Sequence, residues 1–183
     1  MLHENQFLSY NKRDTVCGWI YVPASKPKGI IHIIHGFGEH SRSYLHMIVS
    51  FMEEDYIVCA DDHVGHGKTA IENNTWDDWG YSGVHTMMED EYSLLKITKE
   101  KYPDFPYFLF GHSMGSFIAR NFISKCGNEL SGQGVYETSN LLIDTGHNVQ
   151  TKLFSGYRHE IHNYKEIKNK VVQGIIEFFN SCL

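Results

Sequence analysis

The sequence predicts an α/β fold in which a largely parallel sheet is flanked by helices. Two apolar runs, residues 29–35 and 57–60, each end in a glycine-containing loop, as buried parallel strands commonly do. Residues 43–56 lie between them and carry apolar side chains at helical spacing. A third apolar run, residues 106–110, leads through a short turn into another helical pattern. Such alternation of strand and helix is typical of a parallel sheet with helical crossovers.

The remaining elements follow from similar patterns. Residues 7–22 alternate between apolar and polar side chains before Pro23, which predicts an opening antiparallel strand or hairpin. Residues 71–84 are rich in Asn, Asp, Trp and Gly and are expected to form a surface loop. Further helices are expected over 85–101, 116–123, 135–145 and 164–179, a strand over 149–154, and turns or loops over 61–67, 127–134 and 155–160.

Composition restricts the class of protein. The chain of 183 residues is expected to be a single domain, residues 1–183, with a substantial core. Its formal net charge of -6 offers no basic surface for nucleic acid or anionic lipid, so neither is expected as a partner. The first residues lack the pattern of a secretory signal, and no apolar run reaches the roughly 18 residues of a transmembrane segment.

The four cysteines form no C-x-x-C pair, and Cys59 lies inside an apolar run, where a buried thiol is expected. Together with the absence of a secretory pattern, this cysteine usage favours a reducing, cytoplasmic location.

The motif Gly111-His112-Ser113-Met114-Gly115 identifies Ser113 as the candidate nucleophile. A strand that turns abruptly into a helix holds such a serine on a strained turn with its hydroxyl exposed above the sheet. The serine needs a general base, and in proteins with this turn the base follows the acid late in the chain. Among His147, His159 and His162, His159 is the preferred base because it is expected in a loop between the last strand and the last helix.

Two backbone N–H groups are expected to stabilise the oxyanion that such a nucleophile produces. The first belongs to Met114, which directly follows the serine. The second is assigned to Phe37, because the flanking glycines in Gly36-Phe37-Gly38 allow the backbone to approach a substrate carbonyl. His35 and His40, in the same loop, are interpreted as structural residues.

Four motifs in this order resemble the monoglyceride lipase and lysophospholipase branch of the α/β-hydrolases; they are His35 to His40, Asp62 to Gly67, Gly111 to Gly115 and Arg158 to Ile161. The similarity extends from about residue 7 to about residue 180. It implies an α/β-hydrolase-type sheet flanked by helices. It also implies hydrolysis of a monoglyceride, a lysophospholipid or a similar single-chain lipid ester, through an acyl-enzyme at Ser113 and without a cofactor.

The chain departs from this family between Cys126 and Val135. Members of the family carry two further strands, a helical cap and the catalytic aspartate in this interval, whereas here eight residues join the two positions. We therefore predict an internal deletion near residues 130–133, which leaves the fold truncated. Glu129 is the candidate substitute acid, because Glu137 and Asp144 fall in a predicted helix and are interpreted as solvated side chains.

Three explanations of this deletion remain open. The chain lacks an internal segment of a longer protein, it is a shortened hydrolase, or it is a degraded gene product that folds poorly.

Two alternatives to the lipid ester hydrolase follow from the same features. Without a cap no long acyl tunnel is evident, which favours a small-ester carboxylesterase. The absence of an aligned acid favours a non-catalytic binding protein with this fold.

The run from Asp61 to His66 could be read as a metal site, but His and Asp residues in a glycine turn commonly hydrogen-bond their own backbone, so no metal is expected. Trp76 and Trp79 either line an acyl entrance or pack within their loop.

Overall fold

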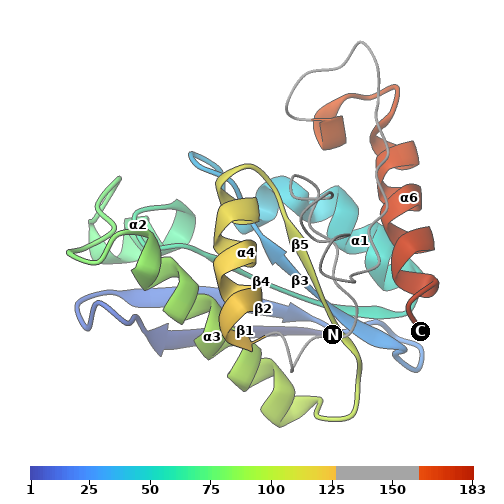
Figure 1. Ribbon diagram of the computed structural model, residues 1–183, viewed down its shortest axis with the longest axis horizontal. Helices are drawn as coiled ribbons and strands as arrows, with labels where there is room; N and C mark the ends of the chain where they lie inside the picture. Colours follow the sequence, from blue (N-terminus) through green and yellow to red (C-terminus); the bar gives the residue numbers. More distant parts are fainter. Residues whose placement is uncertain (127–160) are drawn as a thin grey trace.

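A computed structural model describes residues 1–126 and 161–183. These residues form a five-stranded sheet in the order β1-β2-β4-β3-β5 (Figure 1). The strands are β1 (Leu2–Leu8), β2 (Thr15–Tyr21), β3 (Gly29–Ile34), β4 (Tyr56–Asp62) and β5 (Tyr107–Gly111). β2 pairs antiparallel with β1 and β4, whereas β3 pairs parallel with β4 and β5. The carboxyl ends of β3, β4 and β5 therefore meet at one edge of the sheet, where α/β proteins place their sites.

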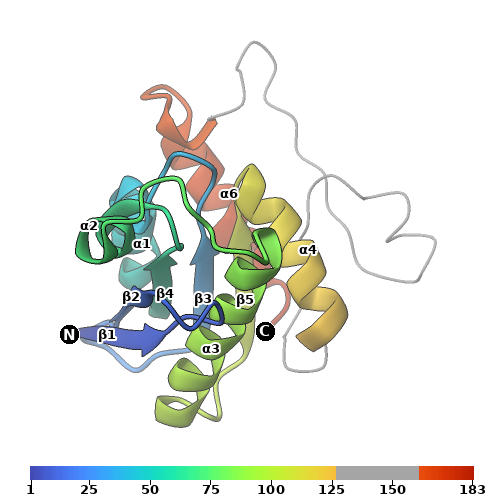
Figure 2. The same ribbon diagram turned by 90° about the vertical axis from the view of Figure 1, so that its left-hand side faces the viewer.

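Helices cover both faces of this sheet. The helical segments are η1 (Ser41–Tyr44), α1 (Leu45–Glu53), α2 (Gly67–Asn73), α3 (Val84–Lys101), α4 (Met114–Cys126), η3 (Ile161–Asn163) and α6 (Lys168–Asn180). α3 and α4 lie next to each other on one face (Figure 2), and α1 and α6 lie together on the other (Figure 1). All six residues of β3 are buried because helices cover both of its faces, which explains its nearly continuous apolar sequence.

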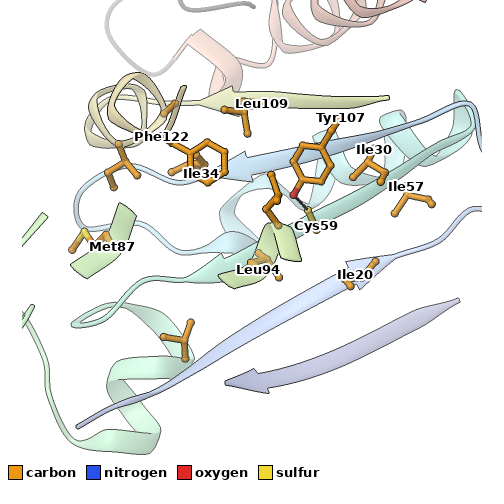
Figure 3. Close-up of a cluster of buried hydrophobic side chains, with 14 of the residues drawn as sticks. Ile20, Ile30, Ile34, Ile57, Cys59, Met87, Leu94, Tyr107, Leu109 and Phe122 are labelled. Atoms are coloured by element: carbon orange, nitrogen blue, oxygen red, sulfur yellow. Dashed lines mark hydrogen bonds between the residues drawn. The ribbon is translucent and has the colours of Figure 1, made fainter. Parts of the chain in front are cut away.

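Two hydrophobic cores follow from this layering. On the face of α3 and α4, Leu94 and Phe122 are buried in a cluster with side chains of the sheet. Figure 3 shows this cluster, in which the Tyr107 hydroxyl lies 3.2 Å from the Cys59 sulfur. On the face of α1 and α6, Phe51 and Phe179 are buried against the other side of the strands. The buried thiol expected at Cys59 is confirmed, since its exposure is 0%.

The structure confirms the predicted fold class and corrects several boundaries. The opening hairpin starts at Leu2 rather than at residue 7. The helix expected over 43–56 ends at Glu53, because Asp55 has φ 63° and turns the chain into β4. β4 continues through Asp62, and α2 includes Gly67 and residues 71–73, which were expected in loops. The last helix begins at Lys168 rather than at residue 164.

Two further expectations fall in the segment that is not described. The elements expected within residues 127–160 and the deletion expected near 130–133 lie outside the described residues. In the described ranges, no helix is both long enough and apolar enough to cross a membrane.

Candidate active site

Ser113 occupies a sharp turn between β5 and α4. Its φ of 52° lies in the left-handed region, which non-glycine residues rarely adopt and which commonly marks a functional position. The amide of Gly115 donates to the His112 carbonyl at 2.8 Å, and the amide of Ser116 donates to the Ser113 carbonyl at 2.9 Å. The chain thus passes from strand to helix within two residues, with Ser113 at the point of reversal.

The two glycines of the motif are required by close packing of backbone. A Cβ at Gly115 would overlap the carbonyl oxygen of Ile34, which ends β3. A Cβ at Gly111 would lie 2.7 Å from the carbonyl oxygen of Gly115 itself. Only glycine at both positions lets the start of α4 approach the end of β3, so the turn fixes Ser113 at the carboxyl edge of the sheet.

Glu39 connects the loop after β3 to the serine turn. Its Oε2 accepts hydrogen bonds from the Gly36 amide at 2.9 Å, the Tyr44 hydroxyl at 2.5 Å and His112 Nδ1 at 3.0 Å. Burial alone would raise the pKa of Glu39, but the hydrogen bonds from His112 and Tyr44 outweigh it and lower the pKa to about 2. Glu39 is therefore ionised at neutral pH and holds the loop residue Gly36 beside His112, the neighbour of Ser113.

The two expected oxyanion donors lie on the segments that Glu39 joins. Met114 is the first residue of α4, so its N–H belongs to the helix N-terminus, where amides lack intrahelical partners. Phe37 lies in the loop after β3, between Gly36 and Gly38, and Gly38 has φ 71°. Within the described part of the chain, neither N–H takes part in a hydrogen bond. Phe37 is 59% exposed, so its side chain is not needed in the core, and the role proposed for this residue involves only its backbone N–H.

The predicted base and acid cannot be placed. His159 and Glu129 both lie outside the described residues. The neighbouring His162 is described and is buried, with its ring stacked on Tyr44 at 5.0 Å and its Nε2 3.9 Å from Glu39 Oε1. Its ring also meets the edge of the His112 ring at 4.5 Å. η3, which carries His162, thus lies against the two segments that form the serine site.

Glu39, His112 and His162 are the site residues that the sequence did not reveal. Glu39 and His112 are 73 positions apart, and no spacing rule indicates their contact. The available signal was weak: Glu39 immediately follows the glycines of the loop, and His112 immediately precedes the serine. A contact between the loop and the turn could have been expected from the parallel pairing of the strands that precede them.

His35 has the structural role expected for it. It is fully buried, and its Nε2 accepts a hydrogen bond from the His63 amide at 3.1 Å. Its Nδ1 therefore carries the proton and donates to the Gly36 carbonyl at 2.8 Å. Burial lowers the pKa of His35 well below its usual value, so the ring stays neutral and fastens the loop after β3.

Trp79 packs against two neighbouring loops, one of them the loop after β3. Its ring lies 5.9 Å from the Phe37 ring and 6.2 Å from the His66 ring. Trp76, in contrast, is 61% exposed. Trp79 therefore packs against other loops instead of within its own, and it places an aromatic surface beside Phe37.

A family comparison agrees with this geometry. Residues 25–135 match the Hydrolase_4 family, described as serine aminopeptidase, S33. The chain belongs to the Hydrolase_4 family. The match includes β3, β4, β5, the loop with Glu39 and the turn with Ser113, and the α/β-hydrolase resemblance found in the sequence is confirmed.

Individual relatives point to the same branch. Human monoglyceride lipase is 38% identical over 97 residues, which cover 53% of this chain and 30% of the lipase. A monoglyceride lipase homolog of monkeypox virus is 34% identical over 106 residues, covering 58% of this chain and 36% of that protein. The chain thus spans about a third of the length of these curated relatives.

A solved structure extends the similarity to the fold. A carboxyl esterase from Bacillus coagulans, solved in complex with glycerol, superimposes with a TM-score of 0.95 at 32% identity. The superposition covers 99% of this chain and 98% of that one. The chain therefore has the α/β-hydrolase fold.

Proposed function

We propose that this chain is a serine ester hydrolase that acts on single-chain lipid esters, monoacylglycerols or lysophospholipids. The observation that carries the proposal is the position of Ser113, held at φ 52° between β5 and the first residue of α4. A serine in this conformation presents its hydroxyl where a helix N-terminus can stabilise negative charge. The similarity to monoglyceride lipases supports the substrate class.

The reaction assigns a role to each proposed residue. His159 removes the proton of the Ser113 hydroxyl while the oxygen attacks the ester carbonyl, and the resulting oxyanion accepts hydrogen bonds from the amides of Met114 and Phe37. The intermediate expels the alcohol, which takes its proton from His159. A water molecule, deprotonated by His159, then attacks the acyl-enzyme and releases the fatty acid with Ser113 restored.

Glu39 contributes by positioning the second oxyanion donor. It binds the amide of Gly36, which precedes Phe37, and the ring of His112, which precedes Ser113. The carboxylate therefore sets the separation of the two proposed donor segments. Since oxyanion donors act only at a well-defined distance, this separation affects the transition state more than the binding of substrate.

Glu129 is proposed as the acid that orients His159. Loss of the orienting acid costs about 10⁴-fold in kcat in the well-studied serine proteases. Glu129→Gln is therefore expected to reduce turnover by a large factor, whereas Glu137→Gln, assigned to a solvated position, is expected to have little effect. Equal activity of the two variants would remove Glu129 from the mechanism.

A small-ester carboxylesterase is the alternative, and the similarity to the Bacillus coagulans esterase favours it. The two activities differ in how turnover depends on acyl length. A lipid ester hydrolase gains kcat/KM as the acyl chain lengthens, because each buried methylene adds about 0.8 kcal/mol of apolar burial. A carboxylesterase is most active on acetyl and butyryl esters. A series of p-nitrophenyl esters, followed by a monoacylglycerol, distinguishes them.

Reaction with a fluorophosphonate tests the nucleophile directly. The intact mass of the purified protein, 21.1 kDa for this chain, is measured before and after exposure to the probe. We expect one adduct on the wild type and on Ser93→Ala, a control on α3, and no adduct on Ser113→Ala. If the folded protein forms no adduct and hydrolyses no ester of the series, the proposal of an ester hydrolase is refuted. The alternative of a non-catalytic binding protein then remains. If the mass measured before exposure to the probe is several kDa above 21.1 kDa, the protein contains a longer chain than this sequence.

A further inference from the structure

Four polar side chains meet in the interior between the sheet and α3. Asp61 lies in β4, His63 follows that strand, His32 lies in β3 and Glu91 lies in α3. Each is at most 1% exposed. We call these four residues the buried acid–histidine cluster. Burying two carboxyl groups together is costly unless a positive charge or a proton is shared between them.

Glu91 stands at the centre of the cluster. Its Oε2 lies 2.6 Å from His32 Nε2, and its Oε1 lies 3.2 Å from His63 Nδ1. His63 Nδ1 is also 3.3 Å from Asp61 Oδ1. One ligand atom each from Asp61, His63 and Glu91 lies within 4.8 Å of the other two. Three elements thus direct a nitrogen and two oxygens toward one point.

Both imidazoles are held by a partner on their far nitrogen. His63 Nε2 lies 3.3 Å from the carbonyl oxygen of His35, which can only accept, so Nε2 carries the proton. In the neutral ring, Nδ1 then directs a lone pair toward the two carboxyl groups. His32 Nδ1 lies 3.0 Å from the Tyr107 hydroxyl. Histidines that bind metal ions are commonly fixed by such a contact on the other nitrogen.

The inward-facing atoms lack hydrogen bonds within the usual geometric limits. In the described part of the chain this applies to both carboxylate oxygens of Asp61 and of Glu91, and to the near nitrogens of His32 and His63. Two buried carboxyl groups whose oxygens lack such hydrogen bonds, with two ring nitrogens directed toward them, favour a cation bound between them.

We propose that Asp61, His63 and Glu91 bind a divalent transition-metal ion of the zinc class, with His32 facing the second oxygen of Glu91. Ligand atoms about 2.0–2.1 Å from a tetrahedral zinc ion lie about 3.3 Å apart. The separations of 3.2 and 3.3 Å around His63 Nδ1 agree with this geometry. Two carboxylates also balance the charge of a divalent ion. Because all ligands are buried, the site is structural and joins α3 to the end of β4.

Two neighbouring polar residues, Asp62 and His66, make hydrogen bonds outside the buried acid–histidine cluster. Asp62 Oδ1 accepts from the amide and the hydroxyl of Ser41, and its Oδ2 accepts from the amide of Lys68. His66 Nδ1 lies 3.0 Å from the Val64 carbonyl. These two residues bind backbone, as expected from the sequence, whereas Asp61 and His63 turn inward. The sequence indicated no metal because it did not bring Glu91, on a distant helix, into the same group.

Metal content and cobalt spectroscopy of the wild-type protein test the site without any variant. The protein purified without chelator is expected to hold about one equivalent of metal. When zinc is added to the protein after its metal has been removed by a chelator, the Tm is expected to rise by at least about 5 °C. Cobalt(II) is expected to give the visible d–d absorption of low coordination number without a thiolate charge-transfer band. A thiolate band would assign the metal to cysteines and overturn the proposal. Metal content below about a tenth of an equivalent, with no response of Tm to zinc or cobalt, would overturn it too.

Variants then assign the ligands. Glu91→Gln preserves the side-chain volume and is expected to weaken zinc binding at least about tenfold. Glu100→Gln, at an exposed position of the same helix, is the matched control and is expected to bind zinc as the wild type does. Unchanged zinc affinity in Glu91→Gln would refute the assignment. If Glu91→Gln fails to fold, the cobalt spectrum and the Tm of the wild type decide the question alone.

Discussion

Replacement of Glu39 by Gln removes the charge that joins the loop after β3 to the serine turn, while it preserves the size of the side chain. In the folded protein the pKa of Glu39 falls from an ordinary value of 4.5 to about 2. This depression corresponds to about 3 kcal/mol of stability at neutral pH. Gln still accepts neutral hydrogen bonds worth about 1 kcal/mol. We therefore expect Glu39→Gln to lose about 2 kcal/mol of unfolding free energy at about pH 7.

The pH dependence identifies the charge as the cause. Because the pKa is depressed in the folded state, the stabilisation is present above the unfolded pKa and is lost as the pH falls toward the folded pKa of about 2. At about pH 3 roughly 2 kcal/mol of it has been lost, and the variant and the wild type are expected to be about equally stable. Urea unfolding followed by tryptophan fluorescence measures the difference at both pH values.

A matched control completes the experiment. Glu100→Gln, at an exposed position of α3, is expected to match the wild type at both pH values within about 0.5 kcal/mol. The reasoning fails if Glu39→Gln is destabilised equally at both pH values, since the loss would then come from packing and not from charge. It also fails if the variant is as stable as the wild type at about pH 7.

Three further expectations concern packing. Gly115→Ala is expected to cost at least about 2 kcal/mol in chemical denaturation, whereas Gly18→Ala, where a Cβ would meet nothing closer than 3.4 Å, is expected to cost far less. Phe179→Ala is expected to cost about 3–5 kcal/mol because Phe179 is 4% exposed, and Phe117→Ala, 56% exposed, about 0.5 kcal/mol or less. Burial raises the pKa of the Cys59 thiol to about 12, so peptide mapping after iodoacetamide treatment should find Cys59 modified only in unfolded protein.

Local patterns predicted the centre of the fold well. β3 has a nearly continuous apolar sequence because both of its faces are covered, and the glycine spacing around Ser113 reflects backbone contacts that allow no side chain. The sequence therefore placed the serine turn between a strand and a helix, as the structure has it. The roles of Ser113, Phe37 and Met114 in catalysis stay predictions.

Other features depend on contacts that a local pattern does not contain. Asp61 and Asp62 were expected in the loop over 61–67, yet β4 includes both. Asp62 is satisfied by Ser41 and Lys68, and Asp61 lies beside His63. α2 was missed because its seven residues begin with a glycine and are too few to show a helical period.

The arrangement of α6 has a consequence for how the protein is made. The Tyr56 hydroxyl binds Asn180 at 2.8 Å, and Phe179 stacks on Phe108 at 4.9 Å, so α6 completes a core whose other elements, β3 and α1, come much earlier in the chain. During synthesis the apolar face of α1 and the sheet stays uncovered until residues 168–180 leave the ribosome. Ribosomes stalled before residue 168 are therefore expected to hold an aggregation-prone intermediate.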